Sequence, residues 1–414
     1  MTTRWLILAD DLTGASDAGV AFAQRGCDTE VTWGDSSPPL DVQVHARDLA
    51  SRASGAQDAA SRHANALRRW LTAGQSLYKK MDSTLRGQPA AEIAALCATL
   101  HELGEPAWGV FAPANPAQKR TTRDGRVWVD GQPLENTDTW RREHSYADAD
   151  LAAMLASAGL QPIKLPLDAV RGGSGALLTV FRAAASSAPG TMLVCDAETD
   201  DDLARIASAA RAAAPGFYAG TAGLARALAA QAFPLRKREV ELPATKHGTL
   251  VAVGSPAKVS REAAQRLAQH LGREPEWVRV RTDGTIDDPT QGFSTYHIAI
   301  QLKRGRDAVV LLETDSLDTT AVNPAFVENY AWALRHALSA AGALIVTGGE
   351  TAAALLQTIQ VRGISLLDEI EPGLALGITR GDVEVPIVTK PGAFGDAQSL
   401  VRCLTRMRQL QRRE

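Results

Sequence analysis

The sequence predicts an α/β fold in two domains, each a mostly parallel sheet flanked by helices, and three observations support this. Short apolar runs alternate with helix-length segments along nearly the whole chain, which is typical of parallel α/β layers. The 414 residues suffice for two domains of roughly 100–200 residues each. Charge and prolines replace an Ala-rich pattern at 233–248, so we expect a linker there and domains at 1–238 and 246–414.

The individual elements follow from these apolar runs and the turn residues between them. In the first domain, strands are expected at 5–9, 29–33, 42–45, 77–80, 108–112, 162–165 and 192–195, with helices such as 56–71 and 89–103 between them. Residues 125–130 predict a β-hairpin that interrupts the alternation. In the second domain, strands are expected at 249–253, 277–280, 307–312, 342–346, 378–379 and 386–389, with helices at 260–271 and 399–414.

Composition and charge argue against several classes of protein. The formal net charge of −3 provides no basic field for nucleic acid, and no apolar run approaches the roughly 18 residues that span a bilayer. No leader pattern precedes the first strand, so we expect a cytoplasmic protein. The four cysteines lie far apart and are expected to be reduced; the eight histidines lack metal-ligand spacing, so no dedicated metal site is predicted.

The most informative motif is a pair of adjacent carboxylates, Asp10 and Asp11, directly after the first strand. In open α/β sheets, ligands bind beyond the carboxyl ends of the strands. Two neighbouring aspartates also repel each other unless a polar partner uses them, so a ligand-binding role is favoured. The alternative is that Asp11 or Thr13 caps the following helix while the other aspartate is solvated.

A second polar segment, 79–87, follows the strand at 77–80. It places Lys80, Asp82, Ser83 and Arg86 close together, which suits a polyol acid better than a core. An arginine can hold a carboxylate through two parallel hydrogen bonds, and hydroxyl and carboxylate groups can select sugar hydroxyls. The alternative is a solvated turn in which Asp82 or Ser83 caps the next helix.

Two further loops follow strands of the first domain. The segment 48–52, which includes Arg52, is explained equally well as a surface loop. In the segment 112–120, prolines fix a loop that carries amide and cationic groups, which favours a site that needs little reordering on binding. Because polar loops follow four strands, the sequence predicts that a small, acidic, hydroxylated molecule binds at this edge of the sheet.

The second domain carries glycine at its strand-to-helix turns, at 253–255, 345–351 and 390–396. Backbone N–H groups at such turns, together with the positive end of a helix dipole, favour a phosphate. The turns match neither the P-loop nor the dinucleotide fingerprint. Phosphate binding is therefore inferred from the recurrence of three turns, and purely structural turns are the alternative.

Asp396 follows the last glycine-rich turn. It is expected either to cap the final helix or to act as the carboxylate that orients or deprotonates an attacking hydroxyl, beside the amides of 392–395. Asp10, Asp11 and Asp82 are further candidates for that catalytic task, and the sequence alone does not rank them.

Ordered motifs extend through both predicted domains: LADDLTGASDAG at 8–19, KKMDSTLRG at 79–87, APANPAQKRTT at 112–122, GTAGLARAL at 220–228, GSPAKVS at 254–260, VTGGETAAAL at 346–355 and KPGAFGD at 390–396. This chain resembles the four-carbon acid sugar kinases, bacterial enzymes similar to D-threonate, D-erythronate and 3-oxo-tetronate kinases. It departs from the family at 137–151, where Glu143, His144 and Tyr146 replace a proline-containing pattern. His144 is either a solvated loop residue or a new substrate contact.

The resemblance implies ATP-dependent phosphorylation of the terminal (4-) hydroxyl of a four-carbon sugar acid, in a cleft between the two domains. It also implies Mg²⁺ as a bridge between phosphate oxygens and a small sugar acid as the binding partner. From charge and hydropathy we expect no nucleic acid or membrane partner, and a homodimer is the candidate assembly. Carried over residue by residue, the resemblance assigns Asp10, Asp11, Arg52, Lys80, Asp82, Ser83 and Arg86 to the substrate, Ser255, Thr347, Gly348, Gly349, Glu350, Gly392 and Gly395 to the nucleotide, and Asp396, Asp82 and Lys80 to catalysis.

Two other functions are alternatives to the kinase. A non-enzymatic two-domain sensor of a phosphorylated sugar or nucleotide would bind similar groups, but it has no need of a carboxylate such as Asp396 beside an anion-binding turn. A nicotinamide-dependent dehydrogenase is disfavoured because no GxGxxG segment with a downstream acidic residue is present.

Overall fold

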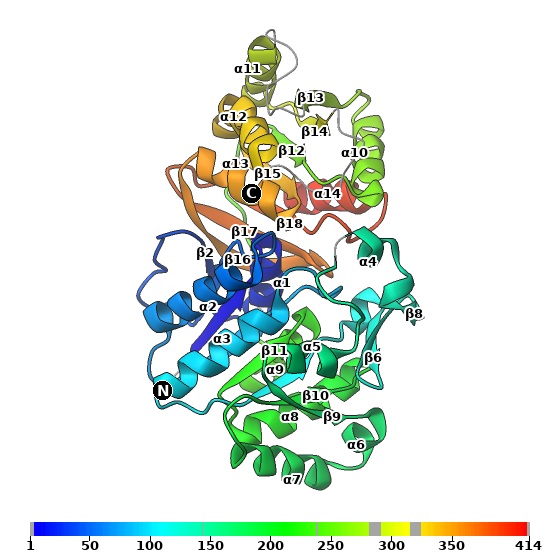
Figure 1. Ribbon diagram of the computed structural model, residues 1–414. Coiled ribbons are helices and arrows are strands. Elements are labelled where there is room, and N and C mark those ends of the chain that lie inside the picture. Colours follow the sequence, from blue (N-terminus) through cyan, green and yellow to red (C-terminus); the bar gives the residue numbers. More distant parts are fainter. Residues whose placement is uncertain (1–3, 143, 237–238, 281–290, 315–323, 412–414) are drawn as a thin grey trace. The chain divides into compact units, whose positions relative to one another are not determined.

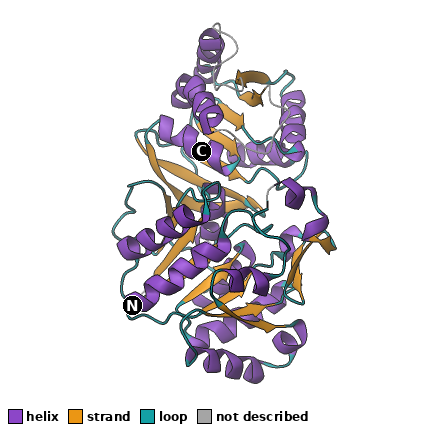
Figure 2. Cartoon of the chain, viewed as in Figure 1, coloured by secondary structure: helices purple, strands orange, loops and turns teal. Residues whose placement is uncertain are grey.

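The computed structural model describes residues 4–142, 144–236, 239–280, 291–314 and 324–411 (Figure 1). The chain divides into two compact units. The first comprises Met1–Thr29 and Pro39–Lys237, and the second comprises Glu30–Pro38 and Arg238–Glu414. The short segment Glu30–Pro38 therefore belongs to the second unit although it lies early in the sequence. Helices and strands alternate in both units (Figure 2).

The first unit is built on a parallel sheet. Within it, the order of strands is β3 (Val44–Asp48), β1 (Arg4–Ala9), β4 (Gln75–Lys80), β11 (Phe217–Gly220), β5 (Gly109–Ala112), β10 (Thr191–Cys195) and β9 (Gln161–Leu165). Because all of these strands run in the same direction, their carboxyl ends lie along one edge, and the loops that follow β1, β3, β4 and β5 meet there.

Helices cover both faces of this sheet. Along β1, alternate residues point to opposite faces: Leu6 and Leu8 join a core cluster with residues of α2 and α3, whereas Trp5 packs on Phe22 of α1 with ring centroids 5.0 Å apart. Burial on both faces explains why the strand is apolar throughout. The helices are α1 (Leu12–Ala23), α2 (Ala56–Trp70), α3 (Pro89–Glu102), α4 (Asp138–Arg142), α5 (Leu151–Ser157), α6 (Leu167–Arg171), α7 (Ser174–Ala185), α8 (Asp200–Ala213) and α9 (Ala222–Ala232).

A small antiparallel sheet interrupts the alternation, as the sequence predicted for 125–130. It consists of β6 (Arg120–Arg123), β7 (Arg126–Val129) and β8 (Gln132–Pro133), and the 3₁₀ helices Pro116–Gln118 and Leu134–Asn136 flank it. The predicted hairpin is therefore confirmed, with one additional strand that precedes it.

The second unit is built on a mixed sheet. Its parallel part has the order β13 (Glu276–Val280), β14 (Ala308–Thr314), β12 (Thr249–Val253), β15 (Ala343–Thr347) and β18 (Pro386–Lys390). It continues through the antiparallel strands β17 (Leu374–Gly381) and β16 (Val361–Glu371) to β2 (Thr29–Thr32). The helices are α10 (Lys258–His270), α11 (Gln291–Lys303), α12 (Pro324–Ala340), α13 (Gly349–Thr358) and α14 (Ser399–Gln411).

The structure differs most from the predictions in the antiparallel strands of the second unit, β16 and β17. Sequence reasoning found only residues 378–379 of β17 and missed β16, because charged residues recur along β16 and several of its residues are only partly buried. It also missed β11, a short strand between two helices. The four cysteines are buried free thiols, as expected. No helix within the described ranges is long and apolar enough to cross a membrane.

Candidate active site

Asp10 and Asp11 begin the site at the carboxyl end of β1, where the chain turns into α1. Asp11 caps this helix: its Oδ1 accepts a hydrogen bond from Gly14 N at 2.8 Å, and its Oδ2 accepts one from Thr13 Oγ1 at 2.7 Å. Asp10 is only 2% exposed, so the alternative of a solvated partner aspartate is wrong. Capping explains Asp11 in part, but both carboxylates also share a cationic partner.

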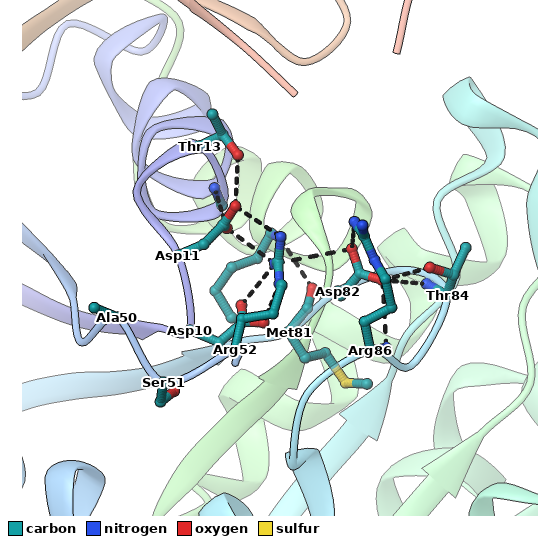
Figure 3. Close-up of polar contacts among 12 residues, drawn as sticks. Asp10, Asp11, Thr13, Ala50, Ser51, Arg52, Met81, Asp82, Thr84 and Arg86 are labelled. Atoms are coloured by element: carbon teal, nitrogen blue, oxygen red, sulfur yellow. Dashed lines mark hydrogen bonds and ion pairs between the residues drawn. The ribbon is translucent and has the colours of Figure 1, made fainter. Parts of the chain in front are cut away.

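That partner is Arg52, whose guanidinium lies between the two aspartates (Figure 3). Its Nε and Nη2 donate to Asp10 at 2.7 and 3.0 Å, and its Nη1 and Nη2 donate to Asp11 at 2.7 and 2.9 Å. Asp48, the last residue of β3, and Ser51 in the following loop are both buried. The surface-loop alternative for 48–52 is therefore wrong, because β3 is the neighbour of β1 and the loops after them meet.

These close charges shift the pKa values of the cluster. Burial alone would raise the pKa of Asp10, but the positive charges of Arg52, Lys79 and Lys80 outweigh it and lower the pKa. Asp48 differs, because burial is reinforced by the charges of Asp11 and Asp10 and raises its pKa to about 7, despite a hydrogen bond from Ala50 N. The cluster thus keeps Asp10 ionised and Asp48 protonated over much of the acidic range.

Asp82 is held in the turn after β4 (Figure 3). Arg86 Nε and Nη2 donate to its two oxygens at 2.9 and 2.8 Å, and Arg52 Nη2 lies 3.8 Å from Oδ1. Thr84 donates to Oδ2 from its hydroxyl and its backbone N–H. Burial opposes ionisation, but the two arginines lower the pKa of Asp82 well below its ordinary value. Since α3 begins further along the chain without a side-chain cap, the capping alternative for Asp82 and Ser83 is wrong.

Two consecutive lysines of β4 point to opposite faces of the sheet. Lys79 Nζ lies 2.7 Å from Glu92 Oε2 on α3. Lys80 Nζ lies on the side of α1, where a Cβ added to Gly14 would be 3.2 Å from it. Lys80 Nζ donates to the Met81 carbonyl at 2.9 Å and forms no ion pair with any residue that the structure describes.

The predicted substrate residues therefore meet at one edge of the sheet in the first unit. Ser83 is buried in the same turn, and the other predicted residues, Lys80 apart, share hydrogen bonds or ion pairs. Such a network of carboxylates and guanidinium groups can bind and orient the hydroxyls of a small polyol. Sequence reasoning missed Glu92, because a glutamate within a helix gives no signal that it lies beneath a buried lysine.

In the second unit, the predicted nucleotide residues follow the neighbouring strands β12, β15 and β18. Gly392 comes so close to the turn after β12 that a Cβ would lie 2.1 Å from Ser255 Oγ. Gly348, with a φ of 92°, is the N-cap of α13, a conformation that glycine adopts without strain. The first N–H groups of a helix have no intrahelical partner, so the start of α13 at Gly349 and Glu350 offers donors to an anion.

Two buried side chains lie beneath these turns. Thr347 Oγ1 has no hydrogen-bond partner among the described residues. Lys390 Nζ donates to Ser260 Oγ at 2.9 Å and to the Pro391 carbonyl at 3.2 Å, while the Lys390 carbonyl accepts a hydrogen bond from Gly348 N at 2.9 Å. Burial lowers the pKa of Lys390 to about 8. Lys390 thus connects the turns at Gly348 and after β18, a role that sequence reasoning did not assign.

Asp396 has a different setting, since 64% of its side chain is exposed. Its Oδ1 accepts hydrogen bonds from Arg402 Nη2 at 2.9 Å and from Gln398 N at 2.7 Å, and Arg402 lowers its pKa. Because α14 begins at Ser399, Asp396 lies before the cap position of the final helix. Gly395, the residue before it, has a φ of 79°, which favours glycine.

Among the residues that the structure describes, no group of three or more His, Cys, Asp or Glu side chains is placed to hold a metal ion. Mg²⁺ often needs only one or two protein carboxylates when phosphates and waters complete its shell. Asp396 and Glu350 are exposed and lie in or beside the glycine-rich turns, so they fit that limited role. Asp10, Asp11 and Asp82 fit it less well, because arginines already engage their oxygens.

The divergent loop at 137–151 makes structural contacts. His144 stacks on Trp140 with ring centroids 5.0 Å apart, and the Tyr146 hydroxyl accepts a hydrogen bond from Ala90 N at 3.1 Å. Glu143 lies outside the described residues. These contacts favour a structural explanation for the loop over a new substrate contact.

Comparison with known proteins shows what this chain is related to. A model of a sugar-binding N-terminal domain matches residues 5–228, and a model of a nucleotide-binding C-terminal domain matches residues 250–400. A D-threonate kinase from Cupriavidus necator is 39% identical over 96% of both chains, and one from Bordetella bronchiseptica is 32% identical over 97% of both. A crystal structure from Salmonella typhimurium LT2 shares the fold, with a TM-score of 0.76 at 21% identity over 97% of this chain and 98% of the other.

The fold and the two matched domains define a sugar-acid kinase. The chain belongs to the four-carbon acid sugar kinase family, as the resemblance of its motifs implied. More distant relatives are named D-erythronate kinase and 3-oxo-tetronate kinase. The sensor and dehydrogenase alternatives are therefore set aside.

Proposed function

We propose that this chain uses ATP to phosphorylate the 4-hydroxyl of a four-carbon sugar acid, with D-threonate as the first candidate substrate. The observation that carries this proposal is the buried network of Asp10, Asp11, Arg52, Asp82 and Arg86, which lies within the residues matched by the sugar-binding domain. The 39% identity to a D-threonate kinase supports threonate over the other four-carbon acids.

In this proposal residues 1–238 bind the sugar acid and residues 246–414 bind ATP. The turns that contain Ser255, Gly392 and Gly395, together with residues 347–350, hold the triphosphate through backbone N–H groups. Asp396 and Glu350 are the residues that would hold Mg²⁺ when it is bound, and the ion would neutralise part of the charge of the phosphates.

Catalysis then depends on positioning more than on a strong base, because phosphoryl transfer passes through a loose transition state. Asp82 is kept ionised by two arginines, so it can orient the attacking hydroxyl but is a weak proton acceptor. Asp396, beside the proposed nucleotide-binding turns, is the second proposed catalytic carboxylate, and its exposed side chain is accessible to a substrate. Lys80 adds a positive charge next to the substrate residues.

A coupled assay of ADP release tests this function. Purified protein is mixed with ATP and, separately, with D-threonate, D-erythronate or a 3-oxo-tetronate, with and without Mg²⁺. We expect turnover with at least one acid, fastest with D-threonate and dependent on Mg²⁺, and none with ATP alone. Absence of turnover with every acid would contradict the proposal. The homodimer and the cytoplasmic location stay predictions, which light scattering and cell fractionation can test.

A further inference from the structure

Four residues from separate segments of the first unit meet on the side of the sheet that α1 and α9 cover. They are Asp17 of α1, Lys80 of β4, Asn115 of the loop after β5, and Arg226 of α9. Arg226 Nη2 donates to Asn115 Oδ1 at 3.0 Å, and Arg226 Nη1 lies 3.9 Å from Asp17 Oδ1. None of Asp17, Asn115 or Arg226 belongs to the substrate residues inferred above, although each lies in one of the motifs.

Asp17 is the unusual member of this group. It is only 3% exposed, yet its Oδ1 accepts no hydrogen bond from any described residue. Leaving a buried carboxylate oxygen without a partner costs stability, so such an atom calls for an explanation. Burial raises the pKa of Asp17 against the opposing charges of Lys80 and Arg226. A ligand hydroxyl or an ordered water that donates a hydrogen bond to this oxygen would complete its hydrogen bonding.

This group and the network of Asp10, Asp11 and Asp82 described earlier carry net charges of opposite sign. Within this group of four residues, Lys80 and Arg226 carry two positive charges and Asp17 carries one negative charge, which leaves one positive charge in excess. The network described earlier has one negative charge in excess, because Asp10, Asp11 and Asp82 outnumber two arginines. Asp10 and Asp11 also lie near Lys80, but Arg52 engages both of them. An anion is therefore favoured beside Lys80 and Arg226, and neutral hydroxyls are favoured beside the aspartates.

The register of the sheet places the two groups next to each other. Lys80 pairs with Ala9 on one side, directly before Asp10, and with Gly220 on the other side, two residues before α9 begins. Arg226 lies on that helix, and 25% of its side chain is exposed, so this residue is not fully enclosed by the protein. A single small molecule next to Lys80 could thus contact both groups.

We propose that Lys80 and Arg226 bind the carboxylate of the sugar acid, while its hydroxyls face Asp10, Asp11 and Asp82. This inference rests on the proposed function and deepens it. Asn115 and Asp17 act as positioning residues, because they hold the guanidinium of Arg226. The ligand carboxylate brings the charge of the Lys80, Arg226 and Asp17 group to zero. The assignment gives Lys80 a binding role at the carboxylate end of the substrate in place of the catalytic role expected from the sequence.

The test compares D-threonate with D-threonamide, which keeps every hydroxyl but lacks the negative charge. For the wild type, we expect kcat/KM to be roughly ten- to a hundredfold higher for the acid, as for a hydrogen bond between charged groups. In Arg226→Gln the preference for the acid over the amide should largely disappear, because kcat/KM for the acid falls while kcat/KM for the amide changes little. Arg226→Lys should recover part of it. The matched control is Arg86→Gln, which should lower activity with both compounds and preserve their ratio.

An unchanged ratio in folded Arg226→Gln would overturn the inference. If that variant fails to fold, Asn115→Ala decides, because it frees the guanidinium from its amide partner and should reduce the preference without removing Arg226. Calorimetric titration with the two compounds separates this inference from the proposed function. If the wild type binds the acid but not the amide, and Arg226→Gln no longer binds the acid, the carboxylate site is supported even where no ADP is released. Equal binding of both compounds by the wild type would contradict the site.

Discussion

Lys79 Nζ lies 2.7 Å from Glu92 Oε2, and both side chains are almost completely buried. Glu92 also accepts a hydrogen bond from Ser51 Oγ at 2.6 Å, in the loop that carries Arg52. This ion pair therefore links β4 and α3 to the loop after β3, directly beneath the candidate active site. It stabilises the arrangement that places Arg52 between its two aspartates.

Glu92→Gln should destabilise the protein strongly, because it leaves the Lys79 ammonium buried without a charged partner. We expect the free energy of unfolding in urea to fall by about 3–5 kcal/mol. The control is Glu102→Gln, which removes a pair with Arg68 whose side chains are 59% and 46% exposed; its cost should be below about 1 kcal/mol. Similar losses in the two variants would contradict the role of burial.

Arg52→Lys should impair the use of the sugar acid far more than the use of ATP. A lysine cannot bond two carboxylates in the bidentate manner of a guanidinium, so Asp10 and Asp11 lose their common partner. We expect kcat/KM for D-threonate to fall by about a hundredfold or more, with little change in KM for ATP. Arg68→Lys, on the exposed face of α2, is the control. An equal effect on both substrates would indicate general damage instead.

Gly392→Ala should raise KM for ATP, because the added Cβ would lie 2.1 Å from Ser255 Oγ and push two turns apart. We expect an increase of about tenfold or more, with KM for the sugar acid little affected. Gly175→Ala is the matched control: nothing lies within 4 Å of its Cβ, and its φ is not positive. That change should leave ATP binding alone and, within α7, add up to about 1 kcal/mol of stability. Unaltered nucleotide kinetics in Gly392→Ala would argue against a phosphate site at this turn.

Asp48→Asn should change how stability depends on pH. The pKa of Asp48 is about 7 in the folded protein, whereas the ordinary value for an aspartate is 3.8. The contribution of Asp48 to stability is therefore complete below pH 3.8 and is lost as the pH rises through 7. Between pH 5 and 7 the wild type should lose about 1.4 kcal/mol per pH unit relative to the variant. Urea unfolding of both proteins at several pH values measures this difference, and parallel curves would show that Asp48 titrates normally.

Asp396→Asn tests the proposed carboxylate at the nucleotide end. The asparagine keeps an oxygen for Gln398 N but loses the negative charge that faces Arg402. We expect kcat to fall by about a hundredfold, the scale of general base or orienting groups, while the melting temperature changes little because the side chain is exposed. Arg402→Gln is the control for the lost ion pair. A rate that is unchanged in Asp396→Asn would exclude this carboxylate from the chemistry.

Several features of the fold and the site could be predicted from the sequence because they depend on local pattern. The apolar run before Asp10 predicted β1, and the polar loops after the strands predicted that the candidate substrate residues lie close together. Their role in binding stays a prediction. Gly348, Gly392 and their neighbours were predicted from strand-to-helix turns, and the structure explains Gly392 by a close approach to Ser255.

What could not be predicted depends on contacts between distant segments. The loop that carries Arg52 looks like a surface loop until the pairing of β3 with β1 is known. Glu92 and Arg226 lie on helices whose sequences give no sign of the buried groups they face. The long antiparallel strand β16 was missed because charged residues recur along it and several of its residues are only partly buried; one of its neighbours, β17, follows it directly, but the other, β2, is far away in the sequence.

The segment Glu30–Pro38 has a consequence for how this protein can be divided. The polypeptide crosses between the units at Glu30, at Pro39 and again at Arg238. A fragment cut at the linker would carry β2 away from β16, its neighbour in the sheet, and would leave an unpaired edge that invites aggregation. Proteolysis or truncation at 233–248 should therefore yield two fragments that co-purify. A C-terminal fragment that folds on its own would need β2, which lies on the N-terminal fragment, to be included in it.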